Sequence, residues 1–252
     1  MDDDQLLRVC HGVVDAVAEA LGTVADWRPS GERAGQYAID LVADRAALSV
    51  LEEAGLGVLS EESGGHHLDA PLVAVIDPVD GSTNAARGIP WFATSICVVD
   101  GEGPRAAVVA NQATGVRYHA VRGGGAWRGT TALHPTDCSQ MRSAVIGLSG
   151  YPRRHFGWAQ YRAFGAAALD LCSVAEGSLD AWAAVGRAHL GSWDYLGGLL
   201  LCRESGAVVV DLDGGELVTF DHNARRAVAA AATPELLDQL RHGALASRPE
   251  GG

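Results

Sequence analysis

The 252-residue sequence contains no lysine, and all nineteen of its basic residues are arginines. Acidic residues number 31, which gives a formal net charge of −12. Nucleic acids and anionic membranes bind clustered positive charge, so we expect neither as a partner. Without lysine, any positive charge that contacts a substrate phosphate must come from arginine or from a bound metal ion.

Cysteine and long apolar runs are also scarce. The five cysteines show no metal-ligand spacing and stand mostly in apolar runs, which predicts buried reduced thiols: Cys10, Cys97, Cys138, Cys172 and Cys202. The acidic N-terminus has no apolar signal core, and no apolar stretch is long enough to span a membrane. We therefore expect a cytoplasmic protein.

The most informative segment is the octapeptide DPVDGSTN at residues 77–84. Its acids, Asp77 and Asp80, follow the apolar run 72–76, which is typical of a buried strand, so both carboxylates are expected to enter a tight loop at the strand end. Pro78 and Gly81 allow the chain to turn so that both acids converge. Close carboxylates repel unless a cation lies between them, and oxygen ligands favour Mg²⁺. Alone, the same spacing also fits a solvated turn.

Two other segments place acids at the ends of predicted elements. Glu61 and Glu62 follow the short apolar strand predicted at 57–59, at the kind of strand end where α/β proteins bind ligands. Asp194 falls in the first turn of a helix for which Ser192 is the expected N-cap and Gly206 the expected end. Each segment alone fits an acidic turn or a capping acid equally well.

Together these segments resemble the inositol monophosphatase family, which comprises Mg²⁺-dependent, lithium-sensitive phosphomonoesterases. The family signatures Gly-Glu-Glu, Asp-Pro-(Ile/Leu)-Asp-Gly-(Thr/Ser)-x-Asn and Trp-Asp have their counterparts here in residues 60–62, 77–84 and 193–194. The resemblance continues through residues 89–96, 124–127 and 162–168. It covers nearly the whole chain.

Helical and strand patterns alternate along the chain and predict a layered α/β fold. Helices are expected at the N-terminus and near 38–54, 166–177, 193–205 and 233–242, with strands between them. The resemblance implies an α-β-α-β-α sandwich of the sugar-phosphatase type, with two subdomains in one catalytic unit. Residues 1–135 would carry the Glu-Glu and octapeptide metal loops, and residues 136–252 would carry Trp-Asp.

The resemblance also implies roles for individual residues. The ligands of two Mg²⁺ ions would be Glu61, Asp77, Asp80, Asp194 and the backbone carbonyl of Val79. A third, looser ion would depend on Glu61. Ser82 matches a hydroxyl that orients the attacking water, and Asp40 matches its acidic partner. The phosphate would be bound at Asp80 and by the amides of Gly81, Ser82, Gly165 and Ala166. Family members are commonly homodimers, and we expect the same here.

Departures from the family pattern concern mainly the substrate. Residues 33–39, before Asp40, lack the lysine and the Val-Thr pair that are common in the family. The glutamate that usually binds sugar hydroxyls is replaced by alanine near Ala184. Discrimination is therefore assigned to the loop 150–158, through Arg153, Arg154 or Trp158, although an ordinary surface loop explains its arginines equally well.

The predicted activity is Mg²⁺-dependent hydrolysis of a small polyol or sugar phosphate, such as myo-inositol 1-phosphate. Histidinol phosphate, fructose 1,6-bisphosphate and 3′-phosphoadenosine 5′-phosphate are alternative substrates. A non-catalytic phosphate-binding regulator on the same fold is the alternative from another functional class. The presence of all four acids and Ser82 argues against that regulator, because a decayed enzyme usually loses at least one of them.

Overall fold

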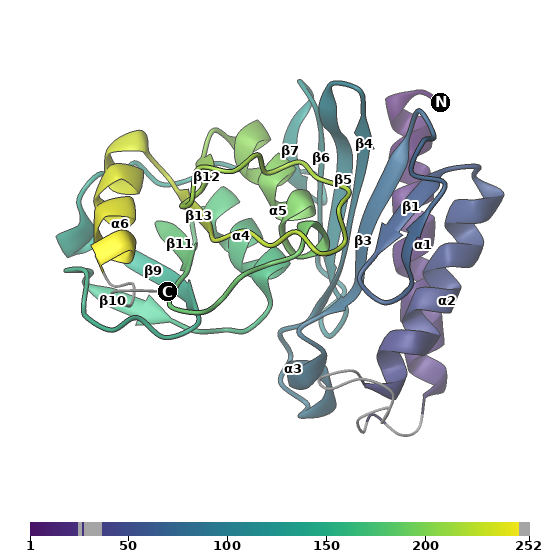
Figure 1. The fold of residues 1–252 in the computed structure, drawn as a ribbon, viewed down its shortest axis with the longest axis horizontal. Coiled ribbons are helices and arrows are strands. Elements are labelled where there is room, and N and C mark those ends of the chain that lie inside the picture. The colour runs from purple at the N-terminus through teal and green to yellow at the C-terminus, as the bar shows by residue number, and fades with distance from the viewer. Residues whose placement is uncertain (25–26, 28–36, 247–252) are drawn as a thin grey trace.

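A computed structural model describes residues 1–24, 27 and 37–246 of the chain. Helices and sheets alternate in five layers, which confirms the predicted α-β-α-β-α sandwich (Figure 1). From one end to the other, the layers are the α1–α2 pair, an eight-stranded sheet, the α4–α5 pair, a five-stranded sheet and α6. The chain segment 33–36, part of the stretch that departs from the family pattern, lies outside the described residues.

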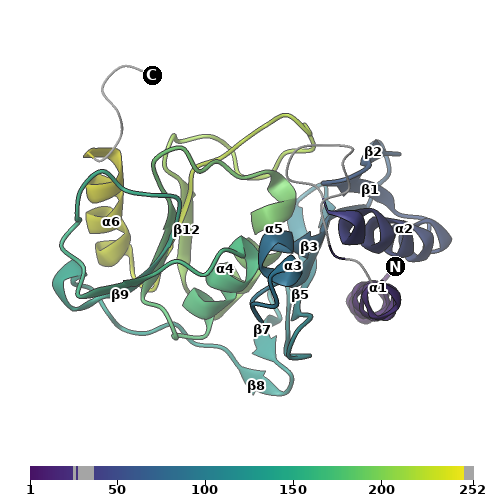
Figure 2. The same ribbon diagram turned by 90° about the horizontal axis from the view of Figure 1, so that it is seen from below.

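The first sheet is built from the N-terminal half of the chain. Its strand order is β2-β1-β3-β4-β5-β6-β7-β8. The bounds are β1 Gly57–Ser60, β2 Gly64–His66, β3 Val73–Asp80, β4 Ala93–Asp100, β5 Gly103–Asn111, β6 Arg117–Val121, β7 Gly125–Arg128 and β8 Thr131–Ala132. The helices α1 (Asp3–Thr23) and α2 (Ala38–Glu53) cover one face of this sheet, and the one-turn helix α3 (Ser82–Ala86) follows β3 (Figure 2).

The second sheet has the strand order β10-β9-β11-β13-β12. Its strands are β9 Val145–Ser149, β10 Gln160–Arg162, β11 Ala181–Ala184, β12 Val208–Asp211 and β13 Val228–Ala231, with a short 3₁₀ turn at Met141–Ser143 before β9. The helices α4 (Ala167–Ala175) and α5 (Ser192–Ser205) lie between the two sheets, and α6 (Pro234–Ala246) covers the outer face of the second sheet.

Hydrophobic spacing explains how the layers pack. Along α1, one stripe of apolar side chains is buried against the first sheet: Leu6, Cys10, Val13, Val17 and Leu21. The helices α4 and α5 are apolar on nearly all sides, because each has a sheet on both faces. A continuous core therefore runs from β3 and β5 through these helices to β11 and β13. The subdomain boundary between residues 135 and 136 stays a prediction.

Two local predictions were wrong. The octapeptide does not leave the strand at Asp77, because β3 continues to Asp80 and its pairing with β4 shifts register between Asp77 and Asp80. A β-bulge between Asp77 and Asp80, rather than a loop, therefore sets the positions of the two carboxylates. In α5 the N-cap is Gly191 and not Ser192, since the Asp194 carboxylate accepts the Gly191 N–H at 2.7 Å.

The cysteines are mostly buried, as their apolar surroundings predict. All five cysteines are free thiols, and all but the half-buried Cys138 are buried. Within the described part of the chain, no helix has both the length and the apolar character that a membrane span requires.

Candidate metal centre

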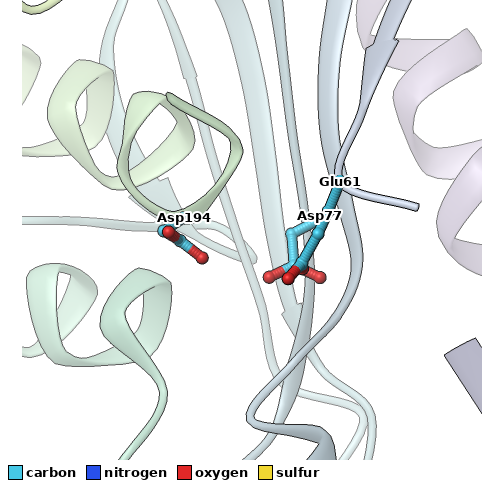
Figure 3. A group of neighbouring side chains, drawn as sticks. All are labelled: Glu61, Asp77 and Asp194. Carbon is cyan, nitrogen blue, oxygen red and sulfur yellow. The ribbon is translucent and has the colours of Figure 1, made fainter. Parts of the chain in front are cut away.

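Three carboxylates from separate elements meet between the first sheet and α5. Glu61 follows β1, Asp77 lies in β3 and Asp194 lies in the first turn of α5. One oxygen atom from each carboxylate lies within 4.8 Å of the other two. Figure 3 shows the side chain of Asp194 pointing from α5 towards those of Glu61 and Asp77. We call these three residues the carboxylate cluster.

Strand pairing explains why two members of the cluster are neighbours. The strands β1 and β3 are parallel, and Ser60 pairs with Ile76. The next residues along the two strands, Glu61 and Asp77, therefore lie side by side, and the Glu61 N–H donates to the Ile76 carbonyl at 3.2 Å. Glu61 thus directly follows the end of β1, and Asp77 directly follows the last residue of β3 that pairs with β1.

The third member is held by the start of α5. Asp194 accepts the Gly191 N–H, which closes a capping turn at the helix N-terminus. Gly191 is required here, because a Cβ atom at this position would lie 2.3 Å from the indole ring of Trp193. The positive end of the helix dipole also favours a carboxylate in this turn.

The electrostatics of the cluster favour a bound cation. Burial raises the pKa of Glu61 to about 8, with further contributions from the negative charges of Asp194 and Glu62. Burial and the neighbouring Glu61 raise the pKa of Asp77 well above its usual range. Burial raises the pKa of Asp194 to about 7. A cation among these oxygens would offset the burial and the repulsion that raise these pKa values, and an all-oxygen donor set suits a hard divalent ion.

The fourth acid, Asp80, is close to the cluster but has different partners. Its two carboxylate oxygens accept the N–H groups of Ala167 at 3.2 Å and Ala168 at 2.7 Å, the first amides of α4. Burial nevertheless raises its pKa to about 8. Asp80 therefore joins the end of β3 in the first sheet to the N-terminus of α4, which lies between the two sheets.

The two segments predicted to bind phosphate lie against each other. Gly81 has a φ angle of +86°, and a Cβ atom there would lie 3.1 Å from both the Ala166 Cβ and the Gly165 carbonyl oxygen. Asn84 closes the contact, because its Nδ2 donates to the carbonyls of Phe164 and Trp91 at 2.7 and 2.8 Å. The structure thus brings Gly81, Gly165 and Ala166 together beside the carboxylate cluster.

The remaining predicted residues lie on α2, α3 and β3. Ser82 begins α3 directly after Gly81, and Val79 donates its N–H to Asp77 at 2.9 Å. Asp40 is buried in the first turn of α2, where it accepts the Tyr37 N–H at 2.7 Å. The Tyr37 hydroxyl lies 3.3 Å from that of Thr83, so the start of α2 contacts the octapeptide.

A buried acid that the sequence reading did not single out links the two halves. Asp170 in α4 accepts the indole N–H groups of Trp91 and Trp182, each at 2.9 Å. Trp91 lies just before β4 and Trp182 lies in β11, so one carboxylate connects α4 to the second sheet and to the segment that leads into the first sheet. Burial raises the pKa of Asp170 to about 7, and the two indole donors oppose this shift.

Two further residues near the cluster were missed because their contacts are remote in sequence. His222 lies 3.1 Å from the carbonyl oxygen of Glu61, through its Nε2 atom. Arg225 lies over the ring of Trp193, with its Cζ atom 5.1 Å from the ring centroid. No spacing pattern in the sequence associates either residue with the acids.

Ala184 stands where the family resemblance leads us to expect a glutamate for sugar hydroxyls. Ala184 ends β11 and is buried. The loop 150–158 packs against residues 185–188 and, with β10, lines a cavity of about 410 Å³ that includes Arg153 and Arg154. Trp158 is buried, with its ring centroid 4.1 Å from that of His155, whereas Arg153 and Arg154 are exposed.

Comparisons with known proteins agree with this geometry. Residues 6–248 match the inositol monophosphatase family. The chain is 30% identical over 256 residues to a fructose-1,6-bisphosphatase/inositol-1-monophosphatase of Archaeoglobus fulgidus, across 96% of this chain and 100% of that protein. It is 33% identical over 208 residues to the Nus factor SuhB of Salmonella typhimurium, across 73% and 76% of the two chains.

A solved structure extends the comparison to a bound ligand. Inositol monophosphate-bound SaIMPase-II superposes with a TM-score of 0.79 at 26% identity. The match covers 96% of this chain and 94% of that chain. The likeness therefore includes both sheets and the helices between them.

Proposed function

The chain belongs to the inositol monophosphatase family, and from that premise we propose that it is a Mg²⁺-dependent phosphatase of small polyol or sugar phosphates. Family membership supports a phosphatase role. The observation that carries the proposal is the carboxylate cluster, because three buried or half-buried acids converge from two halves of the molecule. Such an arrangement costs stability unless a cation neutralises it.

The ligands proposed for two Mg²⁺ ions are Glu61, Asp77, Asp80, Asp194 and the Val79 carbonyl, with Glu61 also serving a third ion. Bound there, the ions would make an attacking water more acidic and neutralise developing charge on the phosphate and leaving oxygens. The amides of residues 81–82 and 165–166 would bind the phosphate oxygens, since both segments already lie in contact. The Ser82 hydroxyl would orient the water, and Asp40 would be the acidic partner of that hydroxyl.

The substrate proposal is a polyol phosphate such as myo-inositol 1-phosphate. Its support is the likeness to SaIMPase-II, which was solved with inositol monophosphate, and to the bifunctional relative from Archaeoglobus fulgidus. Ala184 offers no acceptor for a sugar hydroxyl, so we expect weak selectivity among polyol phosphates. Homodimerisation and cytoplasmic localisation stay predictions.

The decisive experiment measures phosphate release from purified full-length protein, with and without Mg²⁺. The substrates are inositol 1-phosphate, histidinol phosphate, fructose 1,6-bisphosphate and 3′-phosphoadenosine 5′-phosphate. We expect turnover only with Mg²⁺. The alternative is a non-catalytic regulator, and the relative from Salmonella typhimurium is named a Nus factor. Such a regulator would bind phosphate compounds but release no phosphate in a single-turnover assay at any Mg²⁺ concentration.

A variant of Ser82 separates catalysis from binding. If the hydroxyl orients the attacking water, Ser82→Ala is expected to lower kcat by roughly 10²-fold, while substrate affinity changes little. Ser63→Ala, at an exposed serine in the turn after Glu61 and Glu62, is the matched control and is expected to leave both values unchanged. An equal loss in the two variants would contradict the role of Ser82.

A further inference from the structure

The connection between β12 and β13 crosses the molecule from the second sheet to the first (Figure 1). It includes residues 212–227, which we call the strap. Near the tip of the strap, the Nε2 atom of His222 lies 3.1 Å from the Glu61 carbonyl oxygen, although the two residues are 161 positions apart in the chain. A carbonyl only accepts hydrogen bonds, so the Nε2 atom of His222 carries the hydrogen.

The same imidazole packs on the residue that precedes Asp194. The ring centroids of His222 and Trp193 are 4.7 Å apart, with an angle of 33° between the rings. Arg225 also contacts the Trp193 ring, and its Nη1 donates to the His222 carbonyl at 2.8 Å. His222, Trp193 and Arg225 therefore form one packed unit, held by ring contacts, a cation–π contact and a hydrogen bond.

This unit connects two members of the carboxylate cluster that come from different halves of the fold. Glu61 follows β1 of the first sheet, and Asp194 is the neighbour of Trp193 in α5. Trp193 has a fixed position, because its ring occupies the space where a side chain at Gly191 would begin. A hydrogen bond from His222 to the Glu61 main chain thus ties Glu61 to a rigid part of α5.

We propose that His222 is a positioning residue of the metal site, which holds Glu61 beside Asp194 through the strap. The proposal rests on the proposed function only in requiring that the carboxylate cluster binds a divalent cation. Carboxylates without a cation repel each other, and a tether from the Glu61 main chain to the ring of Trp193, the neighbour of Asp194, limits how far they separate before the ion binds. Partners that orient metal ligands typically change metal affinity by about 10–100-fold when they are lost.

The test measures Mg²⁺ binding by calorimetry to metal-free, full-length protein without substrate. His222→Phe keeps a ring on Trp193 but removes the donor, and we expect it to raise the Kd for Mg²⁺ about tenfold or more. His222→Gln keeps an N–H donor and is expected to stay within about threefold of wild type. His189→Ala is the matched control, because His189 is exposed and its Nδ1 atom lies 3.2 Å from the Arg187 carbonyl oxygen of its own loop; the Kd of this variant is expected to be unchanged.

Activity gives a second readout that a purely structural role would not produce. In His222→Phe, the Mg²⁺ concentration for half-maximal activity is expected to rise in parallel with the Kd, with kcat at saturating Mg²⁺ within about threefold of wild type. Should His222→Phe fail to fold, Arg225→Gln loosens the other side of the same unit. We expect that variant to raise the Kd about threefold.

The possible results separate this inference from the proposed function. Wild-type protein that binds no Mg²⁺ would overturn both. Wild-type binding together with unchanged affinity in His222→Phe and Arg225→Gln would overturn the positioning role alone, even if the melting temperature of the metal-free variants fell. A selective loss of affinity in His222→Phe, with rescue in His222→Gln, would support it.

Discussion

The proposed metal end and the proposed leaving-group end of the candidate site are built differently. At the metal end, Asp77, Asp80 and Asp194 accept main-chain N–H groups and stand on strands or at a helix start. At the leaving-group end, Ala184 offers only a methyl group, and the exposed side chains of the loop 150–158 line the nearby cavity. Tyr151 in that loop is 86% exposed.

This contrast separates two requirements of a phosphatase. Charge neutralisation and alignment of the reacting atoms need groups that do not move, and packed strand ends provide them. Selection among alcohols depends on a few contacts at the rim, which a surface loop supplies and which can differ widely between proteins of one fold. We therefore expect substitutions at the metal end to affect all substrates, and substitutions in the loop to change their ranking.

The largest expected effect comes from Asp77→Asn. An amide at this position removes one charge and one strong ligand from the carboxylate cluster, so turnover is expected to fall by roughly 10³-fold for every substrate. Mg²⁺ is expected to raise the melting temperature of wild type, and to raise that of the variant by much less. Activity assays and thermal melts with and without Mg²⁺ measure the two effects.

Asp69→Asn is the control for the loss of an acid in the same part of the chain, because Asp69 is exposed and lies outside the cluster. It is expected to behave as wild type. A wild-type melting temperature that does not respond to Mg²⁺ would contradict the metal site itself.

An intermediate effect is expected on the pH dependence of stability without metal. The pKa values of Glu61 and Asp80 are raised to about 8 and that of Asp194 to about 7 in the folded protein, against about 4 for unfolded carboxyl groups. A raised carboxyl pKa contributes stability that is fully present below about pH 4 and is lost as the pH rises to about 8. Metal-free protein is therefore expected to become less stable across this range.

The comparison of wild type with Asp77→Asn isolates this contribution. Thermal melts of both proteins, in chelator, between about pH 5.5 and 8.5 are expected to show the variant gaining stability relative to wild type as the pH rises. Saturating Mg²⁺ is expected to reverse the ranking at high pH. If the melting temperatures of the two metal-free proteins change with pH in parallel, the carboxylate of Asp77 does not destabilise the metal-free protein at high pH.

The smallest expected effect concerns the loop at the leaving-group end. Replacing Arg153 and Arg154 together by alanine is expected to leave kcat/KM for inositol 1-phosphate within about threefold of wild type. For substrates with a second phosphate, kcat/KM is expected to fall about tenfold, because the arginines would bind that second anion. Assays with inositol 1-phosphate and fructose 1,6-bisphosphate compare the two classes. If inositol 1-phosphate is preferred by orders of magnitude and this ranking survives the double substitution, the loop does not determine selectivity.

Much of the metal end was predictable because its signals are local. The apolar runs before Glu61 and Asp77 predict strands, and Trp193-Asp194 predicts a helix start, so the sequence alone indicates the three acids that the structure brings together. The layered fold followed from the alternation of helices and strands and from the family resemblance. The layered fold and the family membership were both confirmed.

The rest depends on contacts that sequence spacing does not encode. Asp170 reaches Trp91 across 79 positions, and His222 reaches Glu61 across 161. The bulge in β3 was also missed, because Pro78 and Gly81 predict a turn from their own conformational preferences, whereas pairing with β4 keeps the chain extended to Asp80. The roles of Ser82, Asp40 and the phosphate-binding amides stay predictions.

The position of α4 and α5 between the sheets has a consequence for how the chain folds. Their apolar residues belong to one core that includes Val75 of the first sheet and Trp182 of the second. Neither sheet can bury its inner face without these two helices, and both helices come from the C-terminal half of the chain. An N-terminal fragment made during synthesis would therefore expose an apolar sheet until α4 and α5 arrive, and the finished molecule would unfold as one cooperative unit.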